Sequence, residues 1–384
     1  MAARVASLPL WSTPVAAWVV SRLLVLVPAL AAAALFGVPT RGVDGAVPHA
    51  LAFLGGWDTT WYLDVAHDGY PADVSQVGTH QTEFAFFPLL PGVMALASAL
   101  GLNPFLIAVL VSHAAFLVAL VAFHALTRER MGVGRAAIAT WALALFPPTF
   151  VASLAYTEGV VLMLVAVAAW AATRRSYALA GLACAAAAVA RPTGAVAVVL
   201  VALIAARDPH EGRWRRLAAA VLPAVIALGG FLAWMQVARG SWTLPFDAQA
   251  AWDRGNLLTG LVTQLPDDLA AAWGYVTELH VTAAWTAVLR DLTFGALYAL
   301  LLVRLWRSEG GLRSPWVAYS LAALALPLLS GSTASLARFG VLAFPLAWPA
   351  VDWLCADRRR IPRAVIAAVV LTVLLVGQLE MRSP

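Results

Sequence analysis

Long uninterrupted runs of apolar residues constrain this chain more than any other feature. Segments such as 15–37, 104–126 and 217–238 carry very few charges over the length of about 20 residues that a helix needs to cross a bilayer. Hydrophobic residues make up 62% of the 384 positions and charged residues only 12%. A soluble domain has about 25% charged residues. The sequence therefore predicts an all-α polytopic membrane protein and excludes an ordinary soluble domain.

Composition also limits the setting and the partners of the chain. Its strongly basic residues are all arginine, and alanine is abundant, which is typical of a GC-rich bacterial genome and predicts a bacterial cell membrane. The net charge of +5 comes from arginines in short loops, where they report orientation, so no nucleic-acid partner is expected. Cys184 and Cys355 are far apart and lie in no metal or disulfide motif.

The apolar runs predict a multi-pass topology for a single integral-membrane domain over 1–384. About eleven transmembrane helices are expected from their lengths. They lie near residues 15–37, 104–126, 135–153, 156–173, 176–190, 194–206, 217–238, 284–305, 315–331, 338–354 and 364–380. The first run is long enough to span, and we expect it to remain in place rather than to be cleaved as a signal.

The run 84–100 is ambiguous, and the positive-inside rule decides how it is interpreted. If it does not span, the arginine clusters at 128–135, 174–175, 213–216 and 358–360 all face the cytoplasm with the N-terminus. We therefore expect 84–100 to be a non-spanning helix. The first extracytoplasmic loop is then 39–103, the second is 239–283, and both contain amphipathic loop helices.

The stretch GGWDTTWYLDVAHDGY (55–70) is the most polar part of the first outer loop. On a helix over 58–70, Asp64, His67 and Asp68 share a solvated face, whereas Asp58 lies on the apolar side. A carboxylate there is costly unless it has a partner or a function. Asp58 is either a functional carboxylate or the N-cap of this helix, and the two roles are compatible.

Five blocks of the sequence resemble the PIG-V family of GT-C type glycosyltransferases, whose eukaryotic member adds the second mannose to the GPI anchor precursor. The match is strongest over residues 15–200. The blocks are Trp57-Asp58-xxx-Tyr62-Leu63-xx-Ala66-xx-Gly69-Tyr70, Phe84-Ala85-Phe86-Phe87-Pro88-xx-Pro91, Tyr156-Thr157-Glu158, Arg191-Pro192-Thr193-Gly194 and, more loosely, Ser335-Leu336-Ala337-Arg338-Phe339.

The resemblance implies a GT-C type fold and an inverting mannosyltransferase with its active site on the extracytoplasmic side. The donor would be polyprenyl-phosphate mannose, and the acceptor a glycolipid, a lipoglycan or another extracytoplasmic molecule. Asp58 corresponds to the family's catalytic base. Trp57, Tyr62, Tyr156 and Glu158 are the expected substrate-binding residues.

The chemistry of this reaction fits such a residue set. Phosphate leaves as a stable anion, so transfer needs one base for the acceptor hydroxyl rather than the carboxylate pair of glycoside hydrolysis. Arg191 and Arg338 are the candidate ligands of the donor phosphate, because arginine stays charged and binds phosphate with two parallel N–H groups. Neither a cofactor nor a metal is expected.

Plainer roles remain open for several of these residues. Arg191 is equally well explained by an ion pair with Glu158 or by anchoring at the interface. The plainer role of Glu158 is a favourable charge at the start of its helix, and that of Arg338 is anchoring at the membrane edge. For Arg22, inside the first span, we expect snorkelling to the cytoplasmic edge rather than a role at the lipid phosphate. For the whole chain, the alternatives are a GT-C transferase for another lipid-phosphate sugar and a transporter or flippase of a lipid-linked sugar.

Overall fold

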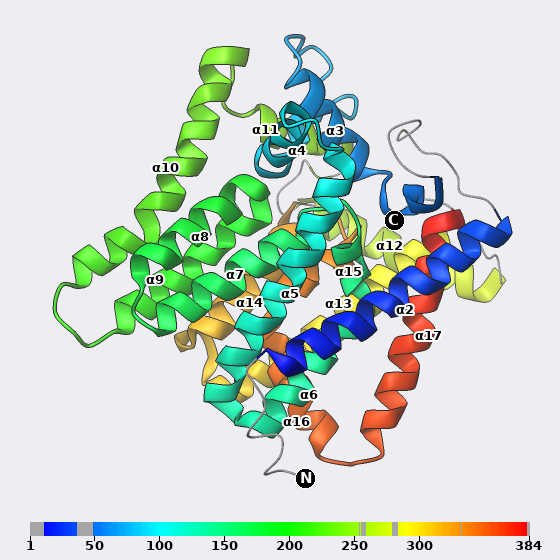
Figure 1. Ribbon diagram of the computed structural model, residues 1–384, viewed down its shortest axis with the longest axis vertical. Coiled ribbons are helices and arrows are strands. Elements are labelled where there is room, and N and C mark those ends of the chain that lie inside the picture. The colour runs from blue at the N-terminus through cyan, green and yellow to red at the C-terminus, as the bar shows by residue number, and fades with distance from the viewer. Residues whose placement is uncertain are drawn as a thin grey trace.

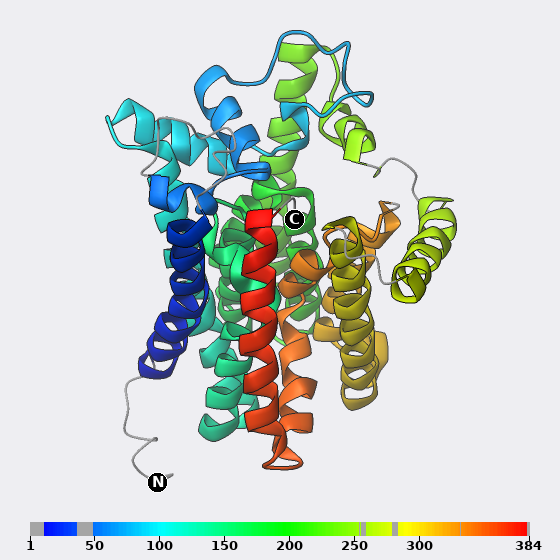
Figure 2. The same cartoon turned by 90° about the vertical axis from the view of Figure 1, so that its right-hand side faces the viewer.

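The computed structural model describes residues 11–36, 49–252, 254, 259–278, 283–330 and 332–381, and these residues form a helical bundle (Figure 1). No strand occurs within these ranges, which contain only an isolated bridge between Val77 and His80. Figure 2 shows the long helices running roughly in one direction, with α3 and α4 gathered at one end. The α-helices are α2 (Ser12–Phe36), α3 (Asp58–Asp68), α4 (Leu89–Ala99), α5 (Pro104–Met131), α6 (Val133–Ala144), α7 (Glu158–Thr173), α8 (Tyr177–Ala190), α9 (Ala197–Arg207), α10 (Arg213–Arg239), α11 (Leu244–Asp247), α12 (Thr259–Glu278), α13 (Ala283–Glu309), α14 (Pro315–Leu329), α15 (Leu336–Phe339), α16 (Ala347–Cys355) and α17 (Arg360–Met381).

Three of the described helices, α2, α5 and α10, are long and apolar enough to cross a membrane. A fourth span results if α6 and the 3-10 helix η3 (Pro147–Ser153), which meet at a bend of 70°, count as one. Apolar helices such as α7, α8 and α14 are shorter than the roughly 20 residues that a straight crossing requires. The predicted all-helical class is confirmed, and helices long and apolar enough to span a membrane are present, whereas the eleven-helix topology and the GT-C type remain predictions.

The segment 338–354 differs from the single helix expected there. Its first residues belong to α15, and two 3-10 turns, η7 (Gly340–Leu342) and η8 (Phe344–Leu346), separate α15 from α16. The backbone leaves helical geometry at Ala343, whose ψ is 51°, and Pro345 two residues later removes a hydrogen-bond donor. Arg338 is therefore presented by a short, irregular segment rather than by a long helix.

Small residues allow the central helices to pack closely. Apolar helices gain little hydrophobic energy by leaving lipid, so their association depends on close backbone approach. Gly181 of α8 shows this directly, because an added Cβ would lie 2.0 Å from the Ala219 carbonyl oxygen of α10. Elsewhere in the bundle larger side chains fill the core, and Phe105, Phe116 and Phe123 of α5 are almost completely buried.

Arg22 corrects one expectation, because its side chain points into the bundle and does not snorkel. Only 3% of the residue is exposed, and its guanidinium donates to the Thr149 carbonyl at 3.1 Å and to Ser153 Oγ at 2.8 Å. It also lies 4.4 Å from the centre of the Phe116 ring. Arg22 does not snorkel because hydroxyl and carbonyl groups of η3 accept its hydrogen bonds inside the protein. Arg22 consequently ties α2 to η3, the segment that leads to Tyr156.

Candidate active site

A sharp turn before α3 determines the direction of the Asp58 side chain. Gly56 and Trp57 have φ angles of 132° and 45°, and α3 begins at Asp58 itself. Asp58 is therefore the first helical residue and not the N-cap, and no side chain caps this helix. The N-cap interpretation was wrong. On the same helix Asp64, His67 and Asp68 are exposed, as the amphipathic pattern predicts.

The carboxylate of Asp58 instead enters an ion-pair network with three segments that are distant in sequence. Its Oδ2 accepts from Arg338 Nη1 at 2.7 Å, and the two side chains are 17% and 11% exposed. Glu158 Oε1 lies 3.7 Å from Arg338 Nε and 2.6 Å from Arg191 Nη1. The structure thus brings together the expected base, the two expected phosphate ligands and Glu158.

Antiparallel helices explain why Glu158 and Arg191 meet. Glu158 begins α7, and Arg191 follows the last residue of α8, so both lie at the same end of this helix pair. The Arg-x-x-Gly motif continues into the short turn η4 (Pro192–Val196). A Cβ at Gly194 would lie 1.9 Å from the Ala187 carbonyl oxygen, so only glycine permits this close return of the chain.

A third arginine joins these groups through the ring of Phe339. The guanidinium carbons of Arg191, Arg338 and Arg254 lie 4.5, 4.9 and 5.0 Å from the ring centre. Sequence reasoning missed Arg254, which lies in the second predicted outer loop. It could have been found in the same way as Arg191 and Arg338, because arginine is uncommon in extracytoplasmic loops under the positive-inside rule. We call the following five residues the ionic cluster: Asp58, Glu158, Arg191, Arg254 and Arg338.

Several buried polar atoms of the ionic cluster have no directed hydrogen bond within the described part of the chain. These atoms are both carboxylate oxygens of Glu158, Nε and Nη1 of Arg191, and Nε of Arg338. Arg191 Nη1 and Glu158 Oε1 are in close ionic contact, but the N–H bonds of Arg191 are not directed at this oxygen. Buried polar groups are usually hydrogen-bonded, so these atoms offer donors for an anion and acceptors for hydroxyl groups.

Two tyrosines named as substrate-binding residues form the support of the cluster. Tyr62 is 4% exposed, and its hydroxyl lies 3.1 Å from Thr157 Oγ1. Tyr156 is 1% exposed, and its hydroxyl donates to the Gly56 carbonyl at 3.5 Å. Burial, followed by the charge of Asp58, raises the pKa of Tyr62 and keeps it neutral. This burial favours a positioning role, whereas the adjacent Trp57 is only half-buried.

Asp291 of α13 holds the segment that carries Arg338, and sequence reasoning did not single it out. Its carboxylate is buried and accepts from the backbone N–H groups of Ser335 at 2.9 Å and Ala337 at 2.8 Å. Ser335 has a φ of 67°, a left-handed conformation that is unfavourable for a residue with a Cβ. Asp291 could have been singled out from the sequence, because it is an acidic residue within an apolar predicted span.

The two predicted outer loops meet at an aromatic contact close to α3. The ring of Trp252 lies 6.0 Å from Trp61 and 5.7 Å from Phe86, and Trp61 stacks on Phe86 at 5.9 Å between ring centres. Trp61 and Trp252 remain partly exposed. This contact connects the chain segment before Arg254 to the helix that begins at Asp58.

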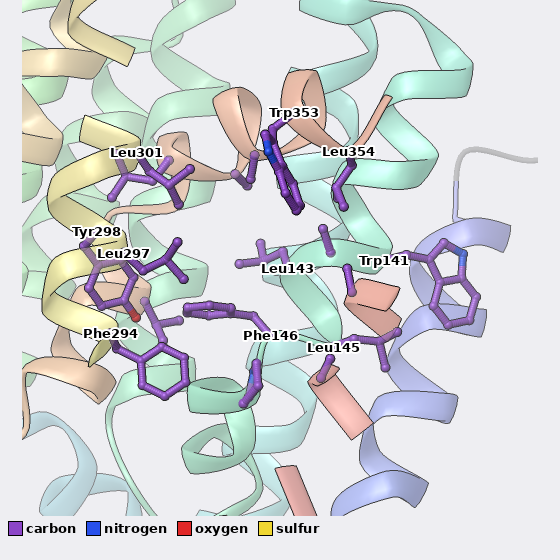
Figure 3. A pocket seen from close by; sticks show the side chains of 18 of the residues that line it. Trp141, Leu143, Leu145, Phe146, Phe294, Leu297, Tyr298, Leu301, Trp353 and Leu354 are labelled. Atoms are coloured by element: carbon purple, nitrogen blue, oxygen red, sulfur yellow. The ribbon is translucent and has the colours of Figure 1, made fainter. Parts of the chain in front are cut away.

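A cavity of about 670 Å³ lies between α6, α13, α16 and α17 (Figure 3). Its wall is almost entirely apolar, with Phe146, Phe294 and Leu301 among the side chains that line it. Gly340 and Val341 also line it, two and three residues after Arg338. A cavity of this size holds a drug-sized apolar molecule or a comparable length of lipid chain. Its wall therefore includes the segment that presents a guanidinium of the ionic cluster.

Comparison with known proteins adds no assignment to this geometry. No family model matches the chain, and neither a curated protein nor a solved structure does. Among the described residues, no three His, Cys, Asp or Glu side chains gather as a metal site would require. The functional argument consequently rests on the ionic cluster, the apolar cavity and the sequence motifs.

Proposed function

We propose that the protein is an inverting glycosyltransferase that moves mannose from a polyprenyl-phosphate donor to a glycolipid, a lipoglycan or another extracytoplasmic acceptor. One observation carries this proposal: the partly buried Asp58 and the buried Glu158 lie among three guanidiniums, and the segment that follows Arg338 lines an apolar cavity. The resemblance to the PIG-V family supports the choice of mannose, and the arginine distribution supports the extracytoplasmic side.

Lipid linkage of the donor is supported by the arrangement of charge and apolar space. A polyprenyl-phosphate sugar has a charged phosphate directly attached to an apolar chain, so its site needs both environments in contact. Arg338 supplies the charge, and the segment after it lines the apolar cavity. A soluble nucleotide sugar would have no use for such a cavity. The cavity is thus the proposed site of the isoprenoid chain.

In the proposed reaction, Arg191 and Arg338 bind the donor phosphate and Asp58 takes the proton of the acceptor hydroxyl. Arg338 is paired with Asp58 before the donor binds. Phosphate oxygens would draw part of this guanidinium's interaction away, and a carboxylate with less cationic stabilisation is a stronger base. The donor itself would therefore prepare the base. Glu158 has Oε1 in ionic contact with Arg191, and its Oε2, which has no hydrogen bond in the described part of the chain, is placed to accept one from a sugar hydroxyl.

The test is a donor panel applied to the purified protein in lipid vesicles. Polyprenyl-phosphate mannose, polyprenyl-phosphate glucose and polyprenyl-phosphate arabinose would each carry a radiolabelled sugar, with a lipid extract as the acceptor source. We expect labelled product from the mannose donor, and the product identifies the acceptor. If only another donor gives product, the protein is still a glycosyltransferase, but its donor sugar is not mannose. If the labelled donor moves between leaflets and no product forms, the protein is a transporter of the lipid-linked sugar and not a transferase.

A further inference from the structure

The charges of the ionic cluster do not balance, and Arg254 makes the difference. Within the described part of the chain, the cluster holds three guanidiniums and two carboxylates, which leaves one positive charge in excess. The adjacent Arg290 and Asp291 pair with each other at 3.0 Å and add no net charge. The nearby hydroxyls of Tyr62 and Tyr156 are neutral. Without Arg254, the remaining two arginines and two carboxylates would be electrically balanced.

Arg254 is held so that its charge acts on the site. Its Nη2 donates to the Ala334 carbonyl at 3.3 Å, and its guanidinium carbon lies 5.0 Å from the centre of the Phe339 ring. Burial and the repulsion of Arg338 and Arg191, partly offset by Asp58, lower the pKa of Arg254 to about 10. The side chain therefore remains protonated at neutral pH while being repelled by its neighbours. A bound anion would relieve this repulsion.

We propose that Arg254 supplies the charge that keeps the site balanced before and after sugar transfer, and that it thereby selects a donor with a single phosphodiester. This inference rests on the proposed function. A phosphodiester carries one negative charge, which equals the excess of the cluster. A pyrophosphate-linked donor carries at least two and would leave the site negative.

The balance persists through the reaction. The bond between the anomeric carbon and the phosphate oxygen breaks, and its electron pair goes to the phosphate. The acceptor oxygen bonds to the anomeric carbon, and its proton passes to Asp58. The phosphate changes from a monoanion to a dianion, while protonation of Asp58 raises the excess of the cluster from one positive charge to two. Net charge in a site that is partly shielded from solvent is costly, so an equal change of phosphate and protein charge lowers the barrier.

Binding of non-reactive phosphates tests the proposal without requiring transfer. The probes are farnesyl methyl phosphate, farnesyl phosphate and farnesyl pyrophosphate, with dimethyl phosphate to show whether a phosphate without a lipid chain suffices. We expect the wild-type protein to bind the diester more tightly than the pyrophosphate. Arg254→Gln should weaken diester binding by about tenfold or more, since a charge-assisted interaction is lost. Arg254→Lys should retain most of it.

A matched control is Arg239→Gln. Arg239 also lies in the second predicted outer loop, donates to the Tyr70 carbonyl at 2.6 Å and packs over Trp234, but it is not part of the ionic cluster. Its substitution should leave the affinity for all four probes unchanged. A second variant, Asp58→Asn, raises the excess to two positive charges. It should shift the preference from the diester towards the dianion of farnesyl phosphate at pH 8.

Three results would overturn the charge-matching role: equal diester affinity in Arg254→Gln and wild type, preference of the wild type for the pyrophosphate, or no change of preference in Asp58→Asn. A lower unfolding temperature shared by ligand-free Arg254→Gln and Arg254→Lys would make Arg254 a structural residue instead. If the probes bind in the expected order of affinity but no sugar is transferred, the proposed enzymatic function is wrong and the anion site remains. The two failures are therefore distinguishable.

Discussion

Removing the carboxylate of Asp291 should destabilise the protein and misplace Arg338. Two backbone N–H groups donate to this buried carboxylate, at 2.9 and 2.8 Å, and hydrogen bonds to charged groups contribute about 1.5–3 kcal/mol each. Asp291→Ala should therefore cost about 3–6 kcal/mol, a large part of the 5–15 kcal/mol typical of a folded protein. Asp291→Asn keeps one carbonyl acceptor, so we expect about half that loss.

The assay is denaturant-induced unfolding in micelles, followed by donor-dependent transfer kinetics on the folded fraction. Asp352→Ala is the control, because Asp352 pairs with Arg135 at the surface with both side chains about half exposed. An exposed pair contributes at most about 1 kcal/mol. We expect Asp291→Asn to raise KM for the donor more than it lowers kcat, since phosphate binding by Arg338 is what the segment 335–337 controls. Equal stabilities of Asp291→Ala and Asp352→Ala would refute this reasoning.

Two further predictions concern the buried ion pair and the cavity. Glu158→Gln should destabilise the protein by about 3–5 kcal/mol because it leaves a buried guanidinium unpaired, and Arg191→Gln in the same chain should recover part of this loss. Strictly additive losses in unfolding measurements would contradict the pairing. Leu301→Trp narrows the apolar cavity and should reduce transfer from long-chain donors at least tenfold while sparing a donor with a short chain. Leu222→Trp, at an exposed position of α10, is its control, and equal losses for both chain lengths would remove the cavity from the donor site.

Much of the fold followed from features that are local in sequence. Apolar run length predicted the helices, and the pattern of 58–70 predicted which side of α3 faces solvent. The breaks between α15 and α16 were less predictable, because the backbone turns at Ala343 and Pro345 within a run that hydropathy alone joins. Arg22 was misjudged because snorkelling depends on whether the neighbouring segment offers partners. The hydroxyls of η3 did so only after folding.

For the candidate site, the sequence identified individual residues but not which of them contact one another. Motifs identified Asp58, Glu158, Arg191 and Arg338, and the structure places these four residues in one network. Their pairing was not readable from spacing, since Asp58 and Arg338 are 280 residues apart. Arg254 lies in no recognised motif, and its significance appears only when the guanidiniums and carboxylates around Phe339 are considered together.

The most direct test of the central claim compares Asp58→Asn with Asp64→Asn in transfer from labelled polyprenyl-phosphate mannose. Both residues are on α3, but Asp64 faces solvent. The account predicts that wild type and Asp64→Asn form a product with inverted anomeric configuration. It also predicts that Asp58→Asn is about 10²–10⁴-fold slower while still binding the donor, as expected on loss of a general base. Equal rates in the two variants, or a product with retained configuration, would contradict the role of Asp58 as the base of an inverting transferase.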